Sequence, residues 1–468
     1  MILTLLEISN NTLFIYYFLS NLFYLGLLIT AIVSSAAHQR RLASIRLERF
    51  KTSPFVPSIA VIVPAHNEEL FIAESVRSLL SLDYPEFEVI VINDGSSDGT
   101  LAALEEAFQL HATDMLYVSE VSSRPVRGVY MSVAEPRLLV VDKEPGGSKA
   151  DAVNAGLNAA SSQYVCVVDA DALLERDALL RVMAPVLQST RPVVAAGGIV
   201  RAINGCRVEN GHIAQVRLPR GGLEVMQVIE YLRAFLIGRE GWAYFNLLVI
   251  ISGAFGVFRR DLVLRIGGYR PSAIGEDLDL VVRMHRYLLE RKEDYRISFV
   301  PDPVCWTEVP SDRRSLASQR ARWQKGLMDV LFANRDMLLR PRYGRIGWIA
   351  LPYQWLFEML APVIELVGYS TIVIAWLLGV LNQEFFLLFM LFGYGFATLI
   401  SVGAVLQEEI TYRRYTRWRD VARLLAYSFL EHFPYRQMHL WWRLKGMWQY
   451  FRGDFKWQPL RRTGFQKT

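Results

Sequence analysis

The sequence predicts an α/β domain with a mostly parallel central sheet, placed between hydrophobic segments that cross or lie on a membrane. Three observations lead to this prediction. From about Pro54 to Pro310, short runs rich in Val and Ile alternate with amphipathic, helix-like stretches. Long apolar runs stand on both sides of this region. Of the 468 residues, 52% are hydrophobic and 21% charged, which is too apolar for an ordinary soluble enzyme and too charged for a pure transporter.

The first hydrophobic segment runs from Leu13 to about Ser35 and is nearly uncharged. It is long enough to cross a hydrocarbon core of ~30 Å. A cleaved signal peptide would have a basic region before its apolar run, whereas the basic residues here follow it. They are Arg40, Arg41, Arg46, Arg49 and Lys51. Positive flanks stay in the cytoplasm, so we expect a permanent anchor with its N-terminus outside.

The alternating region supplies the sheet and its helices. The expected strands are 58–64, 88–93, 138–141 and 164–169, and helix-like segments include 69–82 and 149–160. Such alternation is typical of a mostly parallel sheet covered by helices on both faces. Ligands of these sheets bind at the carboxyl ends of the strands, so polar residues at strand ends are the candidates for chemistry.

A second membrane block begins near residue 350. We expect a hairpin of two apolar segments, 350–381 and 385–406, that returns the chain to the cytoplasm at the basic run 413–419. A third stretch, 421–442, contains Arg423, Glu431, Pro434 and Arg436 and has basic residues on both sides. A full crossing would break the positive-inside pattern, so an interfacial or re-entrant segment is favoured.

Two further stretches have a mixed character. Residues 241–258 are apolar but too short for a comfortable span, so a core strand with a loop is expected. Residues 224–239 alternate charged and apolar side chains, which favours an amphipathic helix at the bilayer surface. The predicted organisation is therefore an anchor with a basic flank over 1–52, an α/β domain over 53–345, and a hairpin, an interfacial segment and a basic tail over 346–468.

Charge and cysteine content limit the possible partners. The net charge is +5, and much of the excess flanks the hydrophobic segments, as expected for contacts with anionic lipid. No zinc spacing or RNA-binding pattern is present, so no nucleic-acid partner is expected. The three cysteines, Cys166, Cys206 and Cys305, have no metal or disulfide spacing and are expected to be thiols.

The first candidate for chemistry follows an apolar strand, where Asp169 and Asp171 stand one residue apart. Two carboxylates at a strand end can share one divalent cation, Mg or Mn, with a diphosphate, and the metal then neutralises the leaving group. A solvated acidic turn is the alternative interpretation.

Two loops can contribute to a nucleotide site. Ala65 and Glu68 lie at the end of the first strand, and Asp94 ends the second, where it can accept hydrogen bonds from a base or ribose. A Gly-Gly-Ser segment leads to Lys149, which can contact phosphate. Helix capping by Ser96, Ser97 and Asp98 is the alternative interpretation of the second loop, and it is compatible with nucleotide binding. Neither a dinucleotide fingerprint nor a complete P-loop is present.

Two helices supply the remaining candidates. Asp277, at the start of an amphipathic helix over 278–289, can act as a general base or simply cap the helix. Gln319, Arg322 and Trp323 fall on one face of another helix, where arginine can pair with diphosphate oxygens and tryptophan can stack on a sugar. A basic interfacial helix with an aromatic anchor is the alternative.

Taken in order, these motifs resemble glycosyltransferase family 2, and in particular its membrane-integrated branch of cellulose, chitin, hyaluronan and poly-N-acetylglucosamine synthases. The resemblance covers about Ser58 to Gly326 and ends in the Q-x-x-R-W motif of Gln319, Arg322 and Trp323. It implies a GT-A fold, the nucleotide-diphospho-sugar transferase architecture, with transmembrane and interfacial helices added.

The resemblance also implies roles for single residues. Ala65, Glu68 and Asp94 would line a uridine pocket, and Lys149 would lie beside the nucleotide. Asp169 and Asp171 would hold Mg or Mn on the diphosphate, and Asp277 would be the base of a single inverting displacement. Gln319 and Arg322 would hold the diphosphate, and Trp323 the acceptor terminus. Ser252 and Gly253, with Ala254, match the acceptor-side loop less closely.

Several hypotheses remain open at this stage. The first is a processive synthase that uses a UDP-sugar, makes a β-linked polysaccharide and faces the cytoplasm from the cell membrane. The second is an enzyme that adds one sugar to a lipid or glycan. A catalytically silent scaffold of an envelope assembly is the third, and a transporter is weaker still. With roughly three spans, a complete polymer channel requires self-association or a membrane partner.

Overall fold

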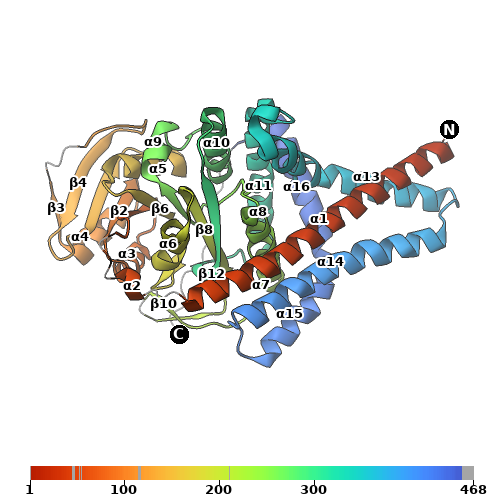
Figure 1. Cartoon of the computed structure of the whole chain (residues 1–468), viewed down its shortest axis with the longest axis horizontal. Coiled ribbons are helices and arrows are strands. Elements are labelled where there is room, and N and C mark those ends of the chain that lie inside the picture. Colours follow the sequence, from red (N-terminus) through yellow and green to blue (C-terminus); the bar gives the residue numbers. More distant parts are fainter. Residues whose placement is uncertain are drawn as a thin grey trace.

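The structure is a computed structural model that describes residues 2–44, 48–51, 53, 55–113, 117–209 and 211–455. The α/β body stands at one end of the molecule, and three long helices extend away from it (Figure 1). They are α1 (Ile2–Ser44), α13 (Ala361–Leu377) and α14 (Gln383–Thr411). Arg46 in the predicted basic flank and the basic tail from residue 456 lie outside the described residues.

The α/β body is built on a ten-stranded mixed sheet in the order β3-β4-β5-β2-β1-β6-β11-β8-β12-β7. Its strands are β1 (Ile59–Ala65), β2 (Phe87–Asp94), β3 (Leu110–Ala112), β4 (Val126–Ser132), β5 (Leu138–Lys143), β6 (Tyr164–Val168), β7 (Leu173–Leu174), β8 (Val193–Ala202), β11 (Phe255–Arg259) and β12 (Arg296–Thr307). A separate ribbon pairs β9 (Arg207–Glu209) with β10 (His212–Gln215).

The centre of the sheet is parallel, as the sequence predicts. Strands β5, β2, β1 and β6 all run in one direction, and β8 and β12 pair in parallel beside them. The four expected strands correspond to these four central strands. Antiparallel pairing enters through β11, which lies between β6 and β8, and through β3, β4 and β7 towards the edges. The result is a sheet whose parallel strand ends meet at one edge.

Helices cover the sheet as expected from their apolar spacing. Those in contact with the body are α3 (Ile72–Leu80), α4 (Thr100–Phe108), α5 (Lys149–Ala159), α6 (Ala178–Gln188), α9 (Arg260–Arg265) and α10 (Glu276–Arg291). In α3, Ile72, Val76 and Leu79 fall on one face and are buried. The α5 helix packs closely because Gly156 leaves room for Ile62 of β1, whose Cγ2 atom would lie 2.4 Å from an added Cβ.

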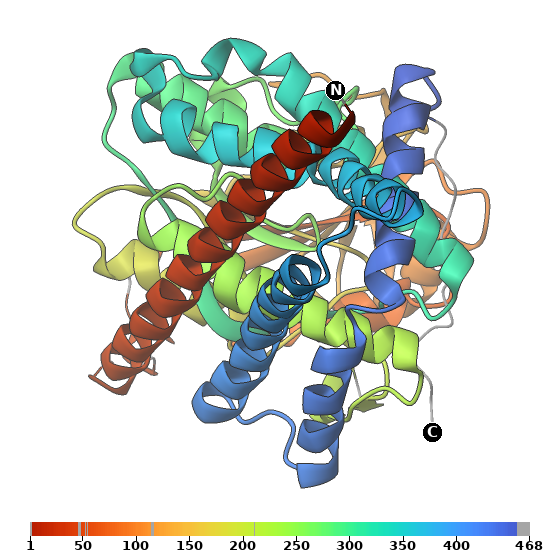
Figure 2. The ribbon, with the colours of Figure 1, turned by 90° about the vertical axis from the view of Figure 1, so that its right-hand side faces the viewer.

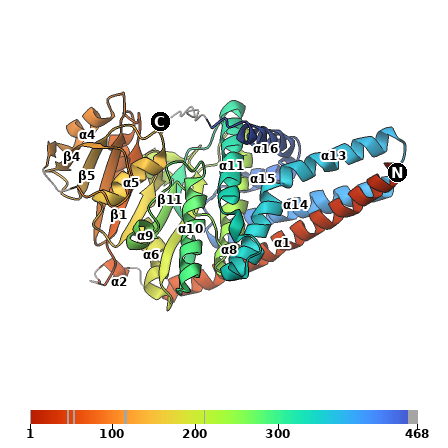
Figure 3. The same ribbon diagram turned by 90° about the horizontal axis from the view of Figure 1, so that it is seen from above.

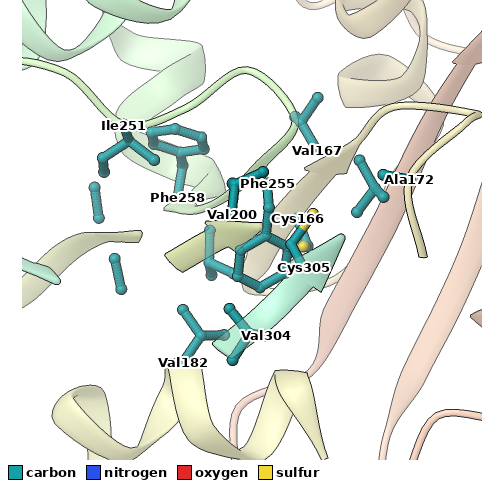
Figure 4. Close-up of a cluster of buried hydrophobic side chains, with 14 of the residues drawn as sticks. Cys166, Val167, Ala172, Val182, Val200, Ile251, Phe255, Phe258, Val304 and Cys305 are labelled. Atoms are coloured by element: carbon teal, nitrogen blue, oxygen red, sulfur yellow. The ribbon is translucent and has the colours of Figure 1, made fainter. Parts of the chain in front are cut away.

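A dense part of the core lies where β6, β8, β11 and β12 meet α6 (Figure 4). Phe255, Val304 and Val182 fill this region, and their side chains are fully buried. Cys166 and Cys305 are equally buried there, and burial raises the pKa of both thiols. They are free cysteines, as is the partly exposed Cys206.

Two elements predicted after β10 are present, namely the amphipathic helix expected over 224–239 and the core strand with a loop expected over 241–258. Residues 222–239 form α7 (Gly222–Tyr231) and the π-helix η1 (Leu232–Arg239). The short helix α8 (Glu240–Tyr244) follows, and a loop then leads into β11, so the apolar stretch 241–258 is largely loop and core strand. Both α7 and η1 lie between the sheet and the long helices.

Two helices are long and apolar enough to cross a membrane, within the described residues, over Leu6–Arg40 and Phe386–Thr411. The predicted segment 350–381 is different, because it is broken. Residues 346–359 form η4 (Ile346–Ala350), α12 (Leu351–Tyr353) and η5 (Gln354–Met359), and α13 continues after a bend of 45°. If residues 346–359 and α13 are taken together as one bent span, they make a third segment that could cross a membrane. All three segments extend together to one side of the body (Figure 3).

The stretch 421–442 is also broken. It divides into α15 (Trp418–Leu430) and α16 (Tyr435–Phe451). Residues 431–434, which end in Pro434, separate these two helices, so no single continuous helix covers the stretch. Seen from the side of the long helices, α1 and α14 run next to each other, while α16 stands to one side of them (Figure 2). The α16 helix packs on α11 (Arg313–Ala333), and Gly446 makes this possible because an added Cβ would lie 2.5 Å from the Ala321 carbonyl oxygen. Two short turns, η2 (Arg335–Met337) and η3 (Pro341–Tyr343), connect α11 to η4.

Charged groups attach the long helices to the body. Arg201 at the end of β8 pairs with both carboxylate oxygens of Glu408 in α14, and their side chains are 3% and 2% exposed. His38 in α1 contacts Asp302 in β12 at 2.5 Å. Buried pairs of this kind cost desolvation free energy and fix geometry more than they add stability. They therefore hold the sheet at a defined position relative to α1 and α14.

Candidate active site

The carboxyl ends of β1 and β2 form the first part of the site. The loops that follow them are joined by hydrogen bonds, since the Ser97 amide donates to Asn67 at 2.8 Å and the His66 Nδ1 atom contacts the Asp94 carbonyl at 2.8 Å. Ala65 ends β1 and is buried, and the Glu68 amide donates to Thr100 at 2.9 Å. These contacts place Ala65, Glu68 and Asp94 around one hollow at the sheet edge.

Asp94 is held by a lysine that sequence reasoning missed. Lys143 ends β5, has no exposed surface, and places its ammonium 2.5 Å from Asp94 Oδ1 and 2.6 Å from Asp151 Oδ2. The Gly146 amide donates to the same Asp94 oxygen at 2.8 Å. Because these bonds converge on Oδ1, they orient the whole carboxylate of Asp94, which lines the cavity. A lysine at the end of an apolar strand was the only hint in the sequence.

The turn after Asp94 depends on a glycine. Gly95 has φ of +60°, in the left-handed region, and an added Cβ would lie 2.6 Å from the Pro145 Cδ atom. Both conditions favour glycine. A residue with a side chain is strained at positive φ, and its Cβ would also clash with Pro145 here. The close approach brings the loop after β2 against the loop before α5. Lys149, the first residue of α5, is thereby placed beside the nucleotide hollow.

A chain of contacts then connects Lys149, Asp169 and Asp277. The Lys149 ammonium forms an ion pair with Asp169 and donates to the Gly253 carbonyl at 2.6 Å. The Gly253 amide in turn donates to Asp277 Oδ2 at 3.2 Å, and the Leu278 amide donates to Asp277 Oδ1 at 2.8 Å. Four segments that are separated in sequence, those of Lys149, Asp169, Gly253 and Asp277, are therefore in direct contact here.

The charged groups around Lys149 lie close enough to shift the pKa values of Lys149 and Glu276. Burial by itself lowers the pKa of Lys149, but Asp169 first and then Glu276 and Asp277 outweigh it, so the pKa is raised and the lysine is protonated at neutral pH. Burial raises the pKa of Glu276, and the neighbouring charge of Asp277 adds to this effect. Asp277 stands in the first turn of α10, where helix amides stabilise a carboxylate. The arrangement concentrates negative charge around one ammonium.

Asp169 and Asp171 fit a divalent cation only together with a substrate. Asp169 already accepts a cationic group, the Lys149 ammonium, so it stands where positive charge is tolerated. Within the described part of the chain, no group of three or more His, Cys, Asp or Glu could hold a metal ion. Two carboxylates leave most of an octahedral shell open, and diphosphate oxygens and water are the ligands that Mg²⁺ usually takes there.

The α11 helix carries the last predicted residues. Gln319 is 8% exposed, and its Oε1 atom has no hydrogen-bond partner among the residues that the structure describes, whereas Trp323 is 45% exposed. Two glycines bring α11 against the start of α10: an added Cβ on Gly275 would lie 3.2 Å from the Gly326 backbone, and one on Gly326 would lie 3.1 Å from Gly275. This backbone approach places the start of α10, which carries Asp277, against the part of α11 that follows Trp323.

One continuous cavity of about 2790 Å³ joins these parts. It is lined by every predicted site residue, namely Ala65, Glu68, Asp94, Lys149, Asp169, Asp171, Ser252, Gly253, Asp277, Gln319, Arg322 and Trp323. It also reaches α1, α13 and α14 at Tyr17, Tyr369 and Phe389. Typical ligand pockets measure roughly 300–1,000 Å³, so this cavity has room for more than one small ligand.

Arg239 is a second charged residue that sequence reasoning missed. It lies on η1, lines the same cavity, and its Nη1 atom is buried without a hydrogen-bond partner among the described residues. Burial lowers its pKa to about 10, against the opposing charge of Asp277. Nothing in the alternating pattern of 224–239 distinguishes this arginine from Arg233, which instead pairs with Glu431 at 2.6 Å.

Two family models match the chain. One is described as glycosyl transferase family 2 and matches residues 60–264, and the other is described as glycosyl transferase family group 2 and matches residues 164–401. The poly-β-1,6-N-acetyl-D-glucosamine synthase of Staphylococcus epidermidis is 27% identical over 311 residues, which are 66% of this chain and 62% of that protein. The probable glycosyltransferase YdaM of Bacillus subtilis strain 168 is 25% identical over 274 residues, 58% of this chain and 55% of that protein.

The chain thus spans less than two thirds of the length of these curated relatives. Among solved structures, the mannosyltransferase PcManGT of Pyrobaculum calidifontis, in complex with GDP-Man and Mn²⁺, is 22% identical with a TM-score of 0.48, over 88% of this chain and 99% of that one. Residues 1–349 of Staphylococcus aureus TarS, in complex with UDP-GlcNAc, are 14% identical with a TM-score of 0.37, over 87% of this chain and 98% of that one.

Proposed function

Because the chain belongs to glycosyl transferase family 2 and is a glycosyltransferase of GT-A architecture, we propose that it extends a β-linked polysaccharide. It moves a sugar from a UDP-sugar to the hydroxyl of the growing chain, at the cytoplasmic face of the cell membrane. The single observation that carries the proposal is the contact chain from Asp169 through Lys149 and Gly253 to Asp277, which joins a diphosphate site to a base within one cavity.

The donor end of the cavity is assigned to the nucleotide. Asp94, oriented by Lys143, accepts hydrogen bonds from the base or ribose, while Ala65 and Glu68 form the wall of the same hollow. Lys149, Gln319 and Arg322 face the diphosphate, where an arginine offers paired, charge-assisted hydrogen bonds. Asp169 and Asp171 would hold a divalent cation, Mg or Mn, which would supply positive charge to stabilise the diphosphate as a leaving group.

The chemical step is a single displacement. Asp277 accepts the proton of the acceptor hydroxyl, whose oxygen attacks the anomeric carbon from the side opposite the diphosphate. The bond between that carbon and the diphosphate oxygen breaks, and UDP leaves with the electron pair. The Gly253 and Leu278 amides hold both Asp277 oxygens, so the carboxylate is oriented before the acceptor arrives. An α-linked donor then gives a β-linked product.

The acceptor is assigned to the side of the cavity that holds Trp323, Ser252 and Gly253. An aromatic ring that is 45% exposed offers a flat apolar surface for a sugar ring. The room beyond Trp323 towards α1, α13 and α14 suits several sugar units. The basic residues after the first span and the apolar outer faces of α13 and α14 support a multi-pass protein with the catalytic domain, residues 53–345, on the cytoplasmic side.

A second candidate function keeps the same chemistry but adds only one sugar to a lipid or glycan. The small number of membrane helices favours it, since two helices and one bent pair make a limited enclosure within the described residues. The two candidates differ in the product and not in the roles of Asp169, Asp171 and Asp277.

The test is a panel of labelled nucleotide sugars given to the purified protein in lipid vesicles with Mg²⁺ or Mn²⁺. UDP-N-acetylglucosamine is the first donor to try, because the Staphylococcus epidermidis relative is named for a poly-N-acetylglucosamine product. We expect release of UDP with one donor and labelled material of high molecular weight on a sizing gel. Short products alone would favour single addition, and no release with any donor would leave the scaffold hypothesis standing.

A further inference from the structure

Arg320 lies inside the Q-x-x-R-W segment without being one of its defining residues. Unlike Gln319 and Arg322, it does not line the cavity, and it is only 3% exposed. Its guanidinium carbon stands 4.1 Å from the centroid of the Trp323 ring. One face of the indole is therefore covered by a buried cation, while Trp323 as a residue is 45% exposed and lines the cavity.

Arg320 is itself held from two other helices. Its Nη2 atom donates to Glu230 Oε2 on α7 at 2.8 Å, and the Tyr435 hydroxyl at the start of α16 donates to the same oxygen at 2.9 Å. Within the described part of the chain, Glu230 is the only carboxylate paired with Arg320. Burial by itself raises the pKa of Glu230, but Arg320, His439, Arg233 and the Tyr435 hydroxyl together outweigh it, with Arg320 the largest of these, so the pKa is lowered and the carboxylate is ionised at neutral pH.

The contacts thus form a series from α16 to the cavity: Tyr435 to Glu230, Glu230 to Arg320, and Arg320 to Trp323. A guanidinium has a planar shape that stacks on an aromatic ring, and its position is fixed when a carboxylate holds the other side. A tryptophan with one face supported has fewer orientations available before its ligand binds. The tryptophan side chain then loses less conformational freedom when the acceptor sugar binds.

We propose that Arg320 is a positioning residue for the acceptor site, held by Glu230 and Tyr435, and that it fixes the orientation of the Trp323 indole against which the acceptor sugar packs. The proposal rests on the proposed function, because it takes Trp323 as the acceptor-binding residue. It makes α16, which is outside the α/β body, a determinant of acceptor affinity. The donor site and the base Asp277 do not depend on this series of contacts.

Kinetics of Arg320→Lys and Tyr435→Phe test the proposal. The first keeps the positive charge but removes the planar group, and the second removes one hydroxyl. With the donor that gives most UDP release, and a short oligosaccharide of the same sugar as acceptor, we expect Arg320→Lys to raise the acceptor KM by about 2- to 30-fold. Tyr435→Phe should raise it less. The donor KM and the kcat at saturating acceptor should stay near wild type.

A structural role alone would give a different pattern. Gln324→Ala is the matched control, because Gln324 ties α11 to Arg443 of α16 at 2.8 Å without contacting the cavity. It should lower the unfolding temperature without changing the acceptor KM. In a Trp323→Ala background, Arg320→Lys should have no further effect on the acceptor KM, because there is no indole to orient.

Additive effects of Arg320→Lys and Trp323→Ala would overturn the proposal, as would equal increases in donor and acceptor KM. An acceptor KM of Arg320→Lys equal to that of wild type would also overturn it while leaving the proposed function intact. Failure of the wild type to transfer any sugar would remove the proposed function and this inference together.

Discussion

Asp277→Asn is expected to lower kcat for sugar transfer by about 10²- to 10⁴-fold, the usual contribution of a general base. The amide keeps the size of the side chain and can still accept hydrogen bonds through its oxygen, but it takes no proton from the acceptor. Its partners, the Gly253 and Leu278 amides, stay in place. Transfer rates at saturating donor and acceptor measure the effect, and binding of UDP, followed by calorimetry, should remain close to wild type.

Glu276→Gln is the matched control. It removes a neighbouring carboxyl group from the same cavity, and burial together with the charge of Asp277 already raises the pKa of Glu276. The loss of Glu276 leaves the proposed proton acceptor, Asp277, in place and still oriented by the Gly253 and Leu278 amides. We expect a much smaller fall in kcat. If Glu276→Gln were as inactive as Asp277→Asn, the assignment of the base to Asp277 would be wrong.

Removing a carboxylate from the proposed metal site should have the second large effect. Asp171→Asn is expected to weaken activation by Mn²⁺ or Mg²⁺ by at least about 10- to 100-fold, the loss typical of residues that merely support a metal ligand. Asp169→Asn should do the same and also release Lys149 from its ion pair. UDP binding, measured by calorimetry with Mn²⁺ and again with a chelator, tests this separately from activity.

Asp98→Asn controls for the loss of a negative charge at the same edge of the sheet. Asp98 lines the cavity, but its oxygens accept bonds from the Thr100 and Glu69 amides, which make it part of a loop and not of a metal site. Its replacement should leave the metal concentration needed for half-maximal activity unchanged. Full activity of the wild type in excess chelator would contradict the proposed role of Asp169 and Asp171.

The fold was predictable where local sequence decides it. Strands β1, β2, β5 and β6 are short runs of Val and Ile bounded by polar turns, and α3 and α5 have apolar residues at helical spacing. The antiparallel insertion of β11 between β6 and β8 was not predictable in this way. A buried strand has the same apolar pattern in either direction, and its neighbours are chosen by packing across the whole sheet.

The membrane segments show the limit of hydropathy. The stretch 350–381 is mostly apolar despite Glu358 and Glu365, so it looks like one span, but the helix bends by 45° at Leu360. Pro362 stands at the start of α13, where its missing amide hydrogen and ring favour a helix start over a helix interior. π-helical turns before the bend shift the register further. A hydropathy average detects neither effect.

In the site, the sequence identified residues but not what holds them. Asp94, Asp169 and Asp277 stand at strand or helix ends that can be located from the sequence. Lys143 was missed because its two carboxylate partners come from β2 and α5, and only the folded sheet brings them together. The approach of Gly275 to Gly326 could not be predicted either. It is a contact between backbones far apart in sequence, and a glycine in a single sequence does not show which residue packs against it.

The most direct test of the account is the anomeric configuration of the first bond that the purified protein forms from an α-linked nucleotide sugar. Nuclear magnetic resonance of the isolated product distinguishes the two configurations. A single displacement assisted by Asp277 predicts a β-linkage. An α-linkage would contradict it, because retention of configuration requires a path other than one direct attack by the acceptor hydroxyl.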